Sequence, residues 1–314
     1  MDKSRTVVGV LLGGISPERP ISLKSGAAVS QALRERGWTV VDIDVDADLP
    51  ARLRAHGVTV AWLALHGPLG EDGCVQGLCE VMRIPYTGSS VLGSAVAMDK
   101  IATKRMLRGE PALHLPEDRA WRVGEPFPED MRYPVMAKTP NGGSTLGIRR
   151  CADAAELRDA LAYCADFGDV VLLEQFVAGD EITVAVLDGR ALPVVSIQPE
   201  AGWFDFDAKY TKGRTRYVVP APIPESTARA AQAGAERAYA CLGLSGVARA
   251  DFIVDAQGIP WFLEINTLPG MTATSLSPMA AGQLGMDFGD LVEAILRGAR
   301  LHVLPGTGTT VATG

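Results

Sequence analysis

The N-terminal part of the chain alternates between short apolar runs and a segment with helical periodicity, and this alternation limits the folds open to it. Residues 6–12 form a β-branched run that ends in two glycines, and residues 38–45 and 58–65 are further apolar runs. Residues 22–36, between the first two runs, have apolar positions at helical spacing. Strands that alternate with helices predict an α/β fold with a doubly wound parallel sheet, whose ligands bind beyond the carboxyl ends of the strands.

Polar side chains follow two of these runs. Glu18 comes shortly after the first run and His66 directly after the third, so we expect both at the ligand-binding edge of the sheet. Glu71 and Asp72 then lead into a helix that ends near Met82.

Composition limits the class of protein. The 314 residues suffice for about two domains, and 47% of them are hydrophobic, which allows a sizeable core. The net charge of −7 argues against a nucleic-acid partner. Five scattered cysteines predict neither a disulfide framework nor a zinc site. The short N-terminal apolar run resembles neither a signal peptide nor a membrane span, so we expect a cytoplasmic protein without a membrane partner.

The rest of the chain continues the mixture of strands and helices. A long functional loop is expected at 203–216, and a weakly ordered Gly/Thr-rich tail at 301–314. The expected strands are 133–138, 170–176, 181–187, 192–198, 247–254 and 259–265, and the expected helices are 153–163 and 227–242.

The last two strands carry a pattern that suits a metal. Arg249 and Asp251 share one face of their strand, as do Glu264 and Asn266 on the next strand, because side chains two apart point the same way. A short connection makes the strands antiparallel neighbours, so Asp251 and Glu264 can lie opposite one another. Two carboxylates and an amide are ligands that Mg²⁺ prefers. A solvated hairpin face with ordinary acidic residues explains this segment equally well.

Other residues suit a nucleotide. Lys138 ends a strand before a glycine-rich turn at 141–145, whose N–H groups could face phosphate oxygens. Lys100 begins a helix, and Glu174 and Glu181 lie at the ends of neighbouring strands. Taken singly, each of these is more simply explained as a hairpin tip, a surface lysine or a solvated carboxylate.

Eight segments, in one order along the chain, resemble the motifs of the D-alanine–D-alanine ligase family of ATP-grasp enzymes. They extend over about residues 6–298 and read LLGGISPERPISLKSG, LALHGPLGEDGCVQG, IPYTGSSVLGSAVAMDK, GGSTLGI, DAKY, ARADF, EINTLPGMT and SLSPMAA.

The resemblance implies an N-terminal Rossmann-like parallel domain followed by a two-part ATP-grasp fold. The implied divisions are a substrate-binding domain at 1–96, a central subdomain with a phosphate lid at 97–183, a C-terminal subdomain with the Mg²⁺ site at 184–300, and a flexible tail at 301–314.

It also implies a reaction. The family joins two D-alanines with ATP through a D-alanyl phosphate, for peptidoglycan precursor synthesis. ATP and two Mg²⁺ ions, with Mn²⁺ as an alternative, are the implied cofactors, two D-alanine molecules are the substrates, and a homodimer is the implied assembly.

Roles transfer to matching positions. Residues implied to hold the metal are Asp251, Glu264 and Asn266, and those implied to bind ATP are Lys100, Lys138, Thr145, Glu174, Phe176, Val177 and Glu181. Those implied to act on the alanines are Glu18, His66, Ser144, Lys209, Tyr210, Arg249, Gly270, Ser275 and Leu276.

Within that last group the implied roles differ. Arg249 and the N–H of Gly270 would form an oxyanion hole, and Glu18 would orient the first ammonium, with His66 nearby. Ser275 and Lys209 would take the second carboxylate, beside a methyl pocket lined by Leu276. Glu18, Ser144 and Tyr210 would form a hydrogen-bonded triad with the lid.

Three alternatives remain open at this point. The chain could be another ATP-grasp ligase, such as a D-alanine–D-lactate ligase, although Tyr210 favours an amine as second substrate. It could be a nucleotide-binding regulatory protein without turnover, which the intact set of Arg249, Asp251, Glu264 and Asn266 disfavours. A dehydrogenase is disfavoured because the dinucleotide-binding GxGxxG motif is absent.

Overall fold

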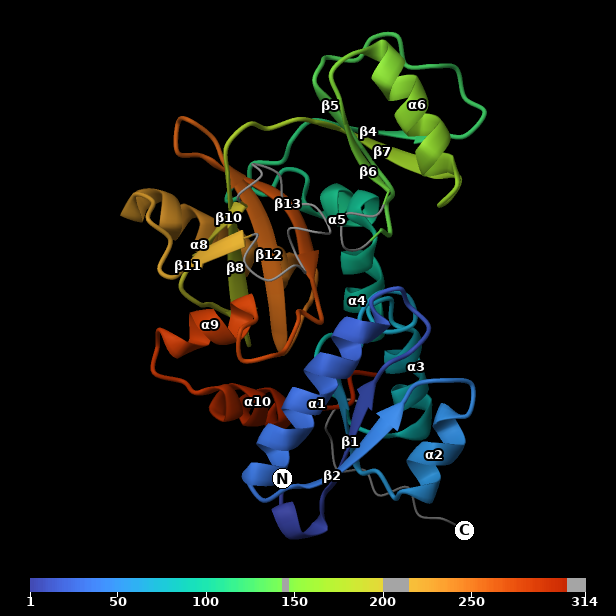
Figure 1. Ribbon diagram of the computed structural model, residues 1–314, viewed down its shortest axis with the longest axis vertical. Helices are drawn as coiled ribbons and strands as arrows, with labels where there is room; N and C mark the ends of the chain where they lie inside the picture. Colours follow the sequence, from blue (N-terminus) through green and yellow to red (C-terminus); the bar gives the residue numbers. More distant parts are fainter. Residues whose placement is uncertain (143–146, 200–214, 304–314) are drawn as a thin grey trace.

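The computed structural model describes residues 1–142, 147–199 and 215–303, and in these residues the strands form three sheets (Figure 1). The N-terminal sheet is parallel, with the order β2-β1-β3. Its strands are β1 (Val7–Leu12), β2 (Thr39–Asp44) and β3 (Val60–Leu63). The predicted parallel sheet is therefore confirmed.

Helices cover both faces of this sheet. Successive side chains of β1 point to opposite faces, and the apolar side chains on each face pack against helices. Val8 and Val10 pack in one core with α1 and α10, and Leu11 packs in another with α2 and α3. The helices are α1 (Arg19–Glu35), α2 (Leu49–Ala55), α3 (Cys74–Met82) and α10 (Phe288–Arg297). α1 begins before the predicted Ser22, since Pro20 lies in its first turn, where no N–H donor is needed.

Two helices lead from the N-terminal sheet to the upper lobe (Figure 1). They are α4 (Val91–Met98) and α5 (Lys100–Leu107). The Asp99 side chain caps α5 by accepting hydrogen bonds from the N–H groups of Ile101 and Ala102. This cap determines where Lys100 stands, at the first turn of the helix.

The upper lobe is a small antiparallel sheet in the order β4-β7-β5-β6, with one helix on one face. Its elements are β4 (Asp118–Arg122), β5 (Val135–Lys138), β6 (Ile148–Cys151), α6 (Ala154–Ala165) and β7 (Val170–Gln175).

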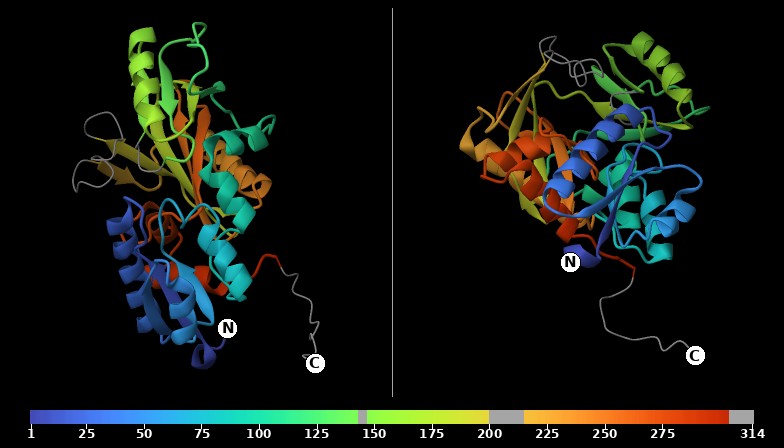
Figure 2. Two further views of the ribbon diagram at one scale, coloured as in Figure 1. Left: turned by 90° about the vertical axis from the view of Figure 1, so that its right-hand side faces the viewer. Right: turned by 60° about the horizontal axis from the view of Figure 1, so that its bottom comes forward.

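The third sheet is antiparallel, in the order β11-β10-β8-β12-β13, with β9 paired to β8. α8 packs on one face, while α9 and α10 lie towards the other and join it to the N-terminal domain (Figure 2). Its elements are β8 (Asp180–Leu187), β9 (Arg190–Ala191), β10 (Val195–Pro199), β11 (Thr215–Val218), α8 (Glu225–Cys241), β12 (Val247–Val254), β13 (Pro260–Asn266) and α9 (Leu276–Gly282).

The predicted loop and the predicted tail lie partly outside the described residues. Of the loop predicted at 203–216, residues 203–214 lie outside the described residues, and Thr215 and Arg216 are not loop but strand, because they pair with β10. Of the tail, 304–314 lie outside the described residues, whereas the N–H groups of His302 and Val303 donate to the Glu80 carboxylate at 2.7 and 3.4 Å. In the described part of the chain, no helix has both the length and the apolar character required to cross a bilayer.

Candidate active site

The strand pair β12–β13 sets four of the predicted site residues opposite one another. Asp251 pairs with Glu264 and Arg249 with Asn266, as the spacing predicts. The pairing then shifts, with Phe252 opposite Phe262, so Leu263 is an extra residue and forms a β-bulge. Bulges re-aim neighbouring side chains, and this one directly precedes Glu264.

Each of the two facing carboxylates has a cation of its own. Arg249 donates from Nε and Nη2 to the two oxygens of Asp251, at 3.0 and 2.9 Å. The Thr183 hydroxyl donates to the same carboxylate at 2.5 Å. Lys100 Nζ lies 2.9 Å from Glu264 Oε2. These pairs offset the repulsion that opposed carboxylates would otherwise have.

The donor set of this strand pair fits Mg²⁺. Asp251 and Glu264 offer hard carboxylate oxygens from neighbouring strands, and Asn266 Oδ1, which accepts from the Leu268 N–H at 2.8 Å, adds an amide oxygen. Within residues 1–142, 147–199 and 215–303, no three His, Cys, Asp or Glu side chains gather as a ligand cluster. The expected set has only two carboxylates, so its metal-binding role remains a prediction.

Two lysines lie beside this strand pair and the small sheet. Lys100 Nζ donates to the Gly142 carbonyl at 2.8 Å, in addition to its contact with Glu264, and so joins the glycine-rich turn to β13. Lys138, at the end of β5, donates from Nζ to Oε1 of Glu174 on the neighbouring strand β7, at 2.7 Å. Both lysines are only 7% exposed, whereas most lysine side chains in proteins lie at the surface.

The residues predicted to bind adenine and ribose lie on or after β7. Glu174 is 1% exposed, and its two carboxylate oxygens face Lys138 and Lys104. Phe176 and Val177 are half-buried just beyond the strand, where the Arg150 guanidinium lies 4.6 Å from the Phe176 ring centre. Glu181 is half-buried near the start of β8.

Glu18 and His66 lie together at the carboxyl edge of the N-terminal sheet. Burial lowers the pKa of His66, the Glu18 carboxylate acts against this shift, and the Arg249 charge adds to it. The Ser25 hydroxyl is 3.4 Å from His66 Nε2. Gly67, at φ +72°, leaves room for Ser16, since a Cβ there would stand 2.5 Å from the Ser16 Oγ. His66 is therefore a buried imidazole that favours the neutral form.

Glu71 is a buried carboxylate whose importance the sequence did not reveal. It is 7% exposed, and its Oε2 accepts from the Gly67 N–H at 2.6 Å. Burial and the charges of Glu18 and Glu264 raise its pKa to about 8, against the opposing effects of the Gly67 N–H and Arg249. The signal available in the sequence was its position after the third predicted strand, but glutamates are mostly exposed in proteins.

The turn after β13 carries the remaining described residues. Ser275 stands at the N-cap position of α9, but its Oγ accepts from the Thr272 N–H at 3.0 Å instead of capping the helix. A Cβ on Gly270 would lie 3.4 Å from that Oγ, an ordinary contact. Leu276 is the first residue of α9 and is partly buried against the core that contains β1, α1 and α10. The predictions for Ser144, Thr145, Lys209 and Tyr210 lie outside the described residues.

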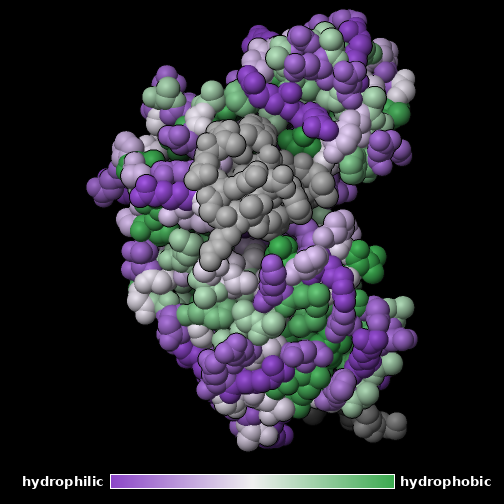
Figure 3. All heavy atoms as spheres, viewed as in Figure 1, coloured by the Kyte–Doolittle hydropathy of each residue, from purple (hydrophilic) through white to green (hydrophobic). Residues whose placement is uncertain are grey.

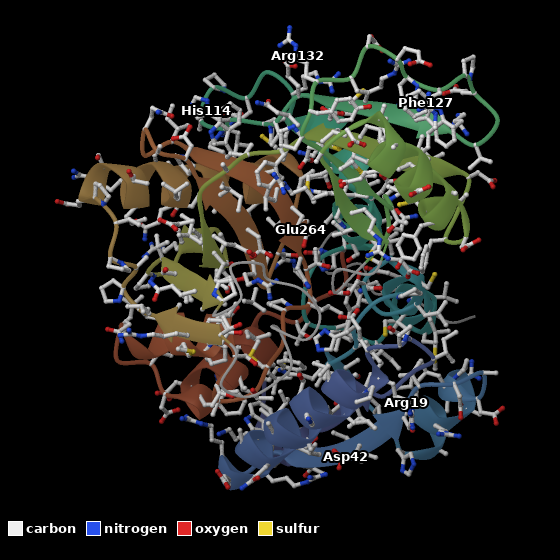
Figure 4. The ribbon with its side chains drawn as sticks, turned by 45° about the horizontal axis from the view of Figure 1, so that its top comes forward. Arg19, Asp42, His114, Phe127, Arg132 and Glu264 are labelled. Carbon is white, nitrogen blue, oxygen red and sulfur yellow. The ribbon has the colours of Figure 1, made fainter. Side chains whose placement is uncertain are left out.

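The predicted residues therefore converge from separate parts of the chain. His66 and Glu71 from the N-terminal domain are close enough to Arg249 on β12 for its charge to affect both, and Glu71 also responds to Glu264. Glu264 lies near the middle of the molecule in Figure 4. In Figure 3 the outline is hollowed between the upper lobe and the N-terminal domain. Such a junction can enclose a substrate between rigid elements.

Two family models match the chain. The one described as D-ala D-ala ligase C-terminus matches residues 116–297, and the one described as D-ala D-ala ligase N-terminus matches residues 48–89.

Curated relatives match over nearly the whole length. The D-alanine--D-alanine ligase of Syntrophotalea carbinolica is 48% identical over 296 residues, which cover 94% of this chain and 96% of the relative. The enzyme of that name from Anaeromyxobacter sp. (strain Fw109-5) is 50% identical over 299 residues, covering 94% and 97%.

Solved structures agree with these matches. The crystal structure of D-alanine--D-alanine ligase from Bacillus anthracis complexed with ATP has a TM-score of 0.83 and 31% identity, covering 93% of this chain and 97% of that chain. A second structure of that enzyme, described without ATP, has a TM-score of 0.81, 33% identity and the same coverage.

Proposed function

The chain belongs to the D-alanine–D-alanine ligase family, and from this premise we propose that it joins two D-alanines with ATP, through a D-alanyl phosphate. The observation that carries the proposal is the convergence of Glu18 and His66, at the edge of the parallel sheet, with Arg249 and Glu264 of β12–β13. A carboxylate suits the ammonium of an amino acid, and a guanidinium beside metal-type ligands suits an oxyanion and phosphate groups.

The first half of the proposed reaction is phosphoryl transfer. A carboxylate oxygen of the first D-alanine attacks the γ-phosphorus of ATP, and ADP leaves. Lys100 and Lys138, on α5 and β5, would neutralise phosphate charge, and positioning with charge neutralisation is most of what this step demands. Asp251, Glu264 and Asn266 would hold Mg²⁺, which when bound neutralises and orients the phosphates.

The second half is attack by an amine. The ammonium of the second D-alanine first loses a proton to solvent, and its nitrogen then attacks the acyl phosphate carbon. The tetrahedral intermediate collapses with loss of inorganic phosphate, which accepts the second proton from the nitrogen. Arg249 and the Gly270 N–H would stabilise the oxyanion of the tetrahedral intermediate. Glu18 would hold the first ammonium, and Ser275, with Lys209, the second carboxylate. His66, held neutral by burial, adds no positive charge that would repel either amine.

Binding of the nucleotide rests on a different set of side chains. Phe176, Val177, Glu174 and Glu181 would surround adenine and ribose, with the turn that contains Ser144 and Thr145 as a lid and Tyr210 closing it through Glu18. The ATP complex of the Bacillus anthracis relative supports this use of the fold.

The larger-scale proposals follow from the same family. We infer a substrate-binding unit at 1–96, two ATP-grasp subdomains at 97–183 and 184–300, and a homodimer. Use of ATP and five free cysteines suit the cytoplasm as the place of reaction.

A product assay tests the proposed function. The protein is incubated with ATP, Mg²⁺ and either D-alanine, L-alanine or D-alanine with D-lactate, and dipeptide, depsipeptide and nucleotide products are separated. We expect D-alanyl-D-alanine and ADP from D-alanine alone, and a fall of about 100-fold or more in turnover for Glu264→Gln, as when an electrostatic catalytic group is removed. Formation of AMP and pyrophosphate, or a preference for D-lactate, would contradict the proposal.

A further inference from the structure

Lys104, one turn after Lys100 on α5, is a lysine with no exposed surface. Its neighbours on the buried side of the helix include Thr103 and Leu107. Burying an ammonium group is costly unless a specific partner compensates for it. An apolar side chain would pack at this position without that cost, so the charge itself requires an explanation.

The partner is Glu174, which joins Lys104 to Lys138. Lys104 Nζ lies 2.8 Å from Glu174 Oε2, and Lys138 Nζ lies 2.7 Å from Glu174 Oε1. We call Lys104, Glu174 and Lys138 the buried trio. Burial would raise the pKa of Glu174, but the charges of Lys138 and Lys104 outweigh it and hold that pKa below the ordinary value. The trio thus contains two ammonium groups and one carboxylate.

Lys138 is the most exposed residue of the buried trio, so the excess positive charge acts mainly through it. Lys104 is 0% exposed and Glu174 1%, whereas Lys138 is 7% exposed at the end of β5, before the glycine-rich turn. If Lys138 were the sole partner of Glu174, the two charges would cancel. Because Lys104 compensates Glu174 from the opposite oxygen, the charge of Lys138 is left to attract an anion.

We propose that Lys104 is a positioning residue for the nucleotide: it compensates Glu174 from within the protein and so leaves Lys138 with a net positive charge towards the phosphates. This inference rests on the proposed function, in which Lys138 contacts ATP. A simpler role, in which the trio only ties α5 to the small sheet, predicts a loss of stability without a charge-dependent change in ATP affinity.

Calorimetric titration with Mg-ATP, without D-alanine, separates the two roles. Lys104→Met makes the trio neutral, and we expect the variant's dissociation constant for ATP to rise about tenfold, the effect of one charge about 10 Å away at an effective dielectric constant of about 20. Because Glu174 is also proposed to contact adenine, the single variant and the double variant Lys104→Met with Glu174→Gln are compared with Mg-tripolyphosphate, which has no adenine. The double variant restores the net charge of one, so its tripolyphosphate affinity should return to within about threefold of the original protein. The KM for D-alanine should stay unchanged in Lys104→Met.

The matched control is Arg105→Met, which removes a charge from an exposed position of the same helix and should leave ATP affinity unaltered. If Lys104→Met is too unstable to purify, Lys104→Gln removes the charge but retains a donor for Glu174, and the same comparison applies. Equal tripolyphosphate affinities for the single and double variants would overturn the inference. Failure of the unaltered protein to form dipeptide would overturn the proposed function instead, since the assay of dipeptide is separate from the titration.

Discussion

At the scale of single residues, burial and charge change what each side chain can do. Glu71 and Glu18 are both carboxylates in loops that follow strands of the same sheet, but the pKa of Glu71 rises to about 8 because it is buried near other carboxylates. At neutral pH Glu71 is therefore mostly protonated and limits the negative charge near Glu18.

This shift makes stability depend on pH. The raised pKa of Glu71 means that its contribution is complete below the ordinary value of 4.5 and is lost as the pH rises through about 8. Glu71→Gln, which keeps an oxygen to accept from the Gly67 N–H, should remove the dependence. Relative to the variant, the unaltered protein should lose about 1 kcal/mol of unfolding free energy per pH unit over this range.

Thermal unfolding at pH 6 and pH 9 checks the prediction. Glu35→Gln, at an exposed position on α1, serves as the control and should show the same pH dependence as the unaltered protein. If Glu71→Gln and the unaltered protein lost stability equally between pH 6 and pH 9, Glu71 would be ionised over that whole range.

At the scale of elements, α5 unites the candidate nucleotide residues. It begins at Lys100 because Asp99 caps it, and its buried side carries Lys100 to Gly142 and Glu264 and Lys104 to Glu174. One helix thus contacts the glycine-rich turn, β13 and β7. The sequence predicted that a helix begins at Lys100, but the burial of both lysines depends on the sheets that close over it.

Loss of the cap should therefore affect both stability and binding. Asp99→Ala removes the acceptor for the N–H groups of Ile101 and Ala102, and we expect a loss of about 1 kcal/mol in unfolding free energy. ATP affinity should also weaken, because the first turn that holds Lys100 loosens. Asp99→Asn, which can still cap the helix, is the matched variant, and equal losses in the two variants would exclude capping as the cause. Chemical denaturation and ATP titration measure the two effects.

At the scale of the whole molecule, the C-terminal helices join the first domain to the last sheet. Leu291 and Leu296 of α10 pack in one core with Val8 of β1 and Val195 of β10. Across the same junction, Nη2 of Arg36, just after α1, lies 2.6 Å from Asp287 Oδ1 and 2.8 Å from Asp290 Oδ1. Residues far apart in sequence therefore support both walls of the candidate site, Glu18 and His66 on one side and Arg249 on the other.

Damage to this junction should destabilise both regions together. Leu291→Ala removes a fully buried side chain and should cost about 3 kcal/mol, from lost burial and the cavity left behind. Scanning calorimetry should show the whole main transition at lower temperature. Leu284→Ala, at a position 63% exposed, should shift it little. Separate transitions for the N-terminal sheet and the large sheet in Leu291→Ala would contradict a shared core.

The sequence by itself determined the alternation of strands and helices, the facing pairs on β12–β13 and the order of family motifs, because periodicity, turn residues and motif spacing are local properties. It also predicted which side chains belong to the site, and their roles and the division into domains stay predictions. Only the tertiary structure decided the β-bulge at Leu263, the cation beside each carboxylate, and the burial of Glu71 and Lys104. These depend on neighbours brought together by packing, and the pKa and charge balance of a group depend on those neighbours, not on the residues beside it in the chain.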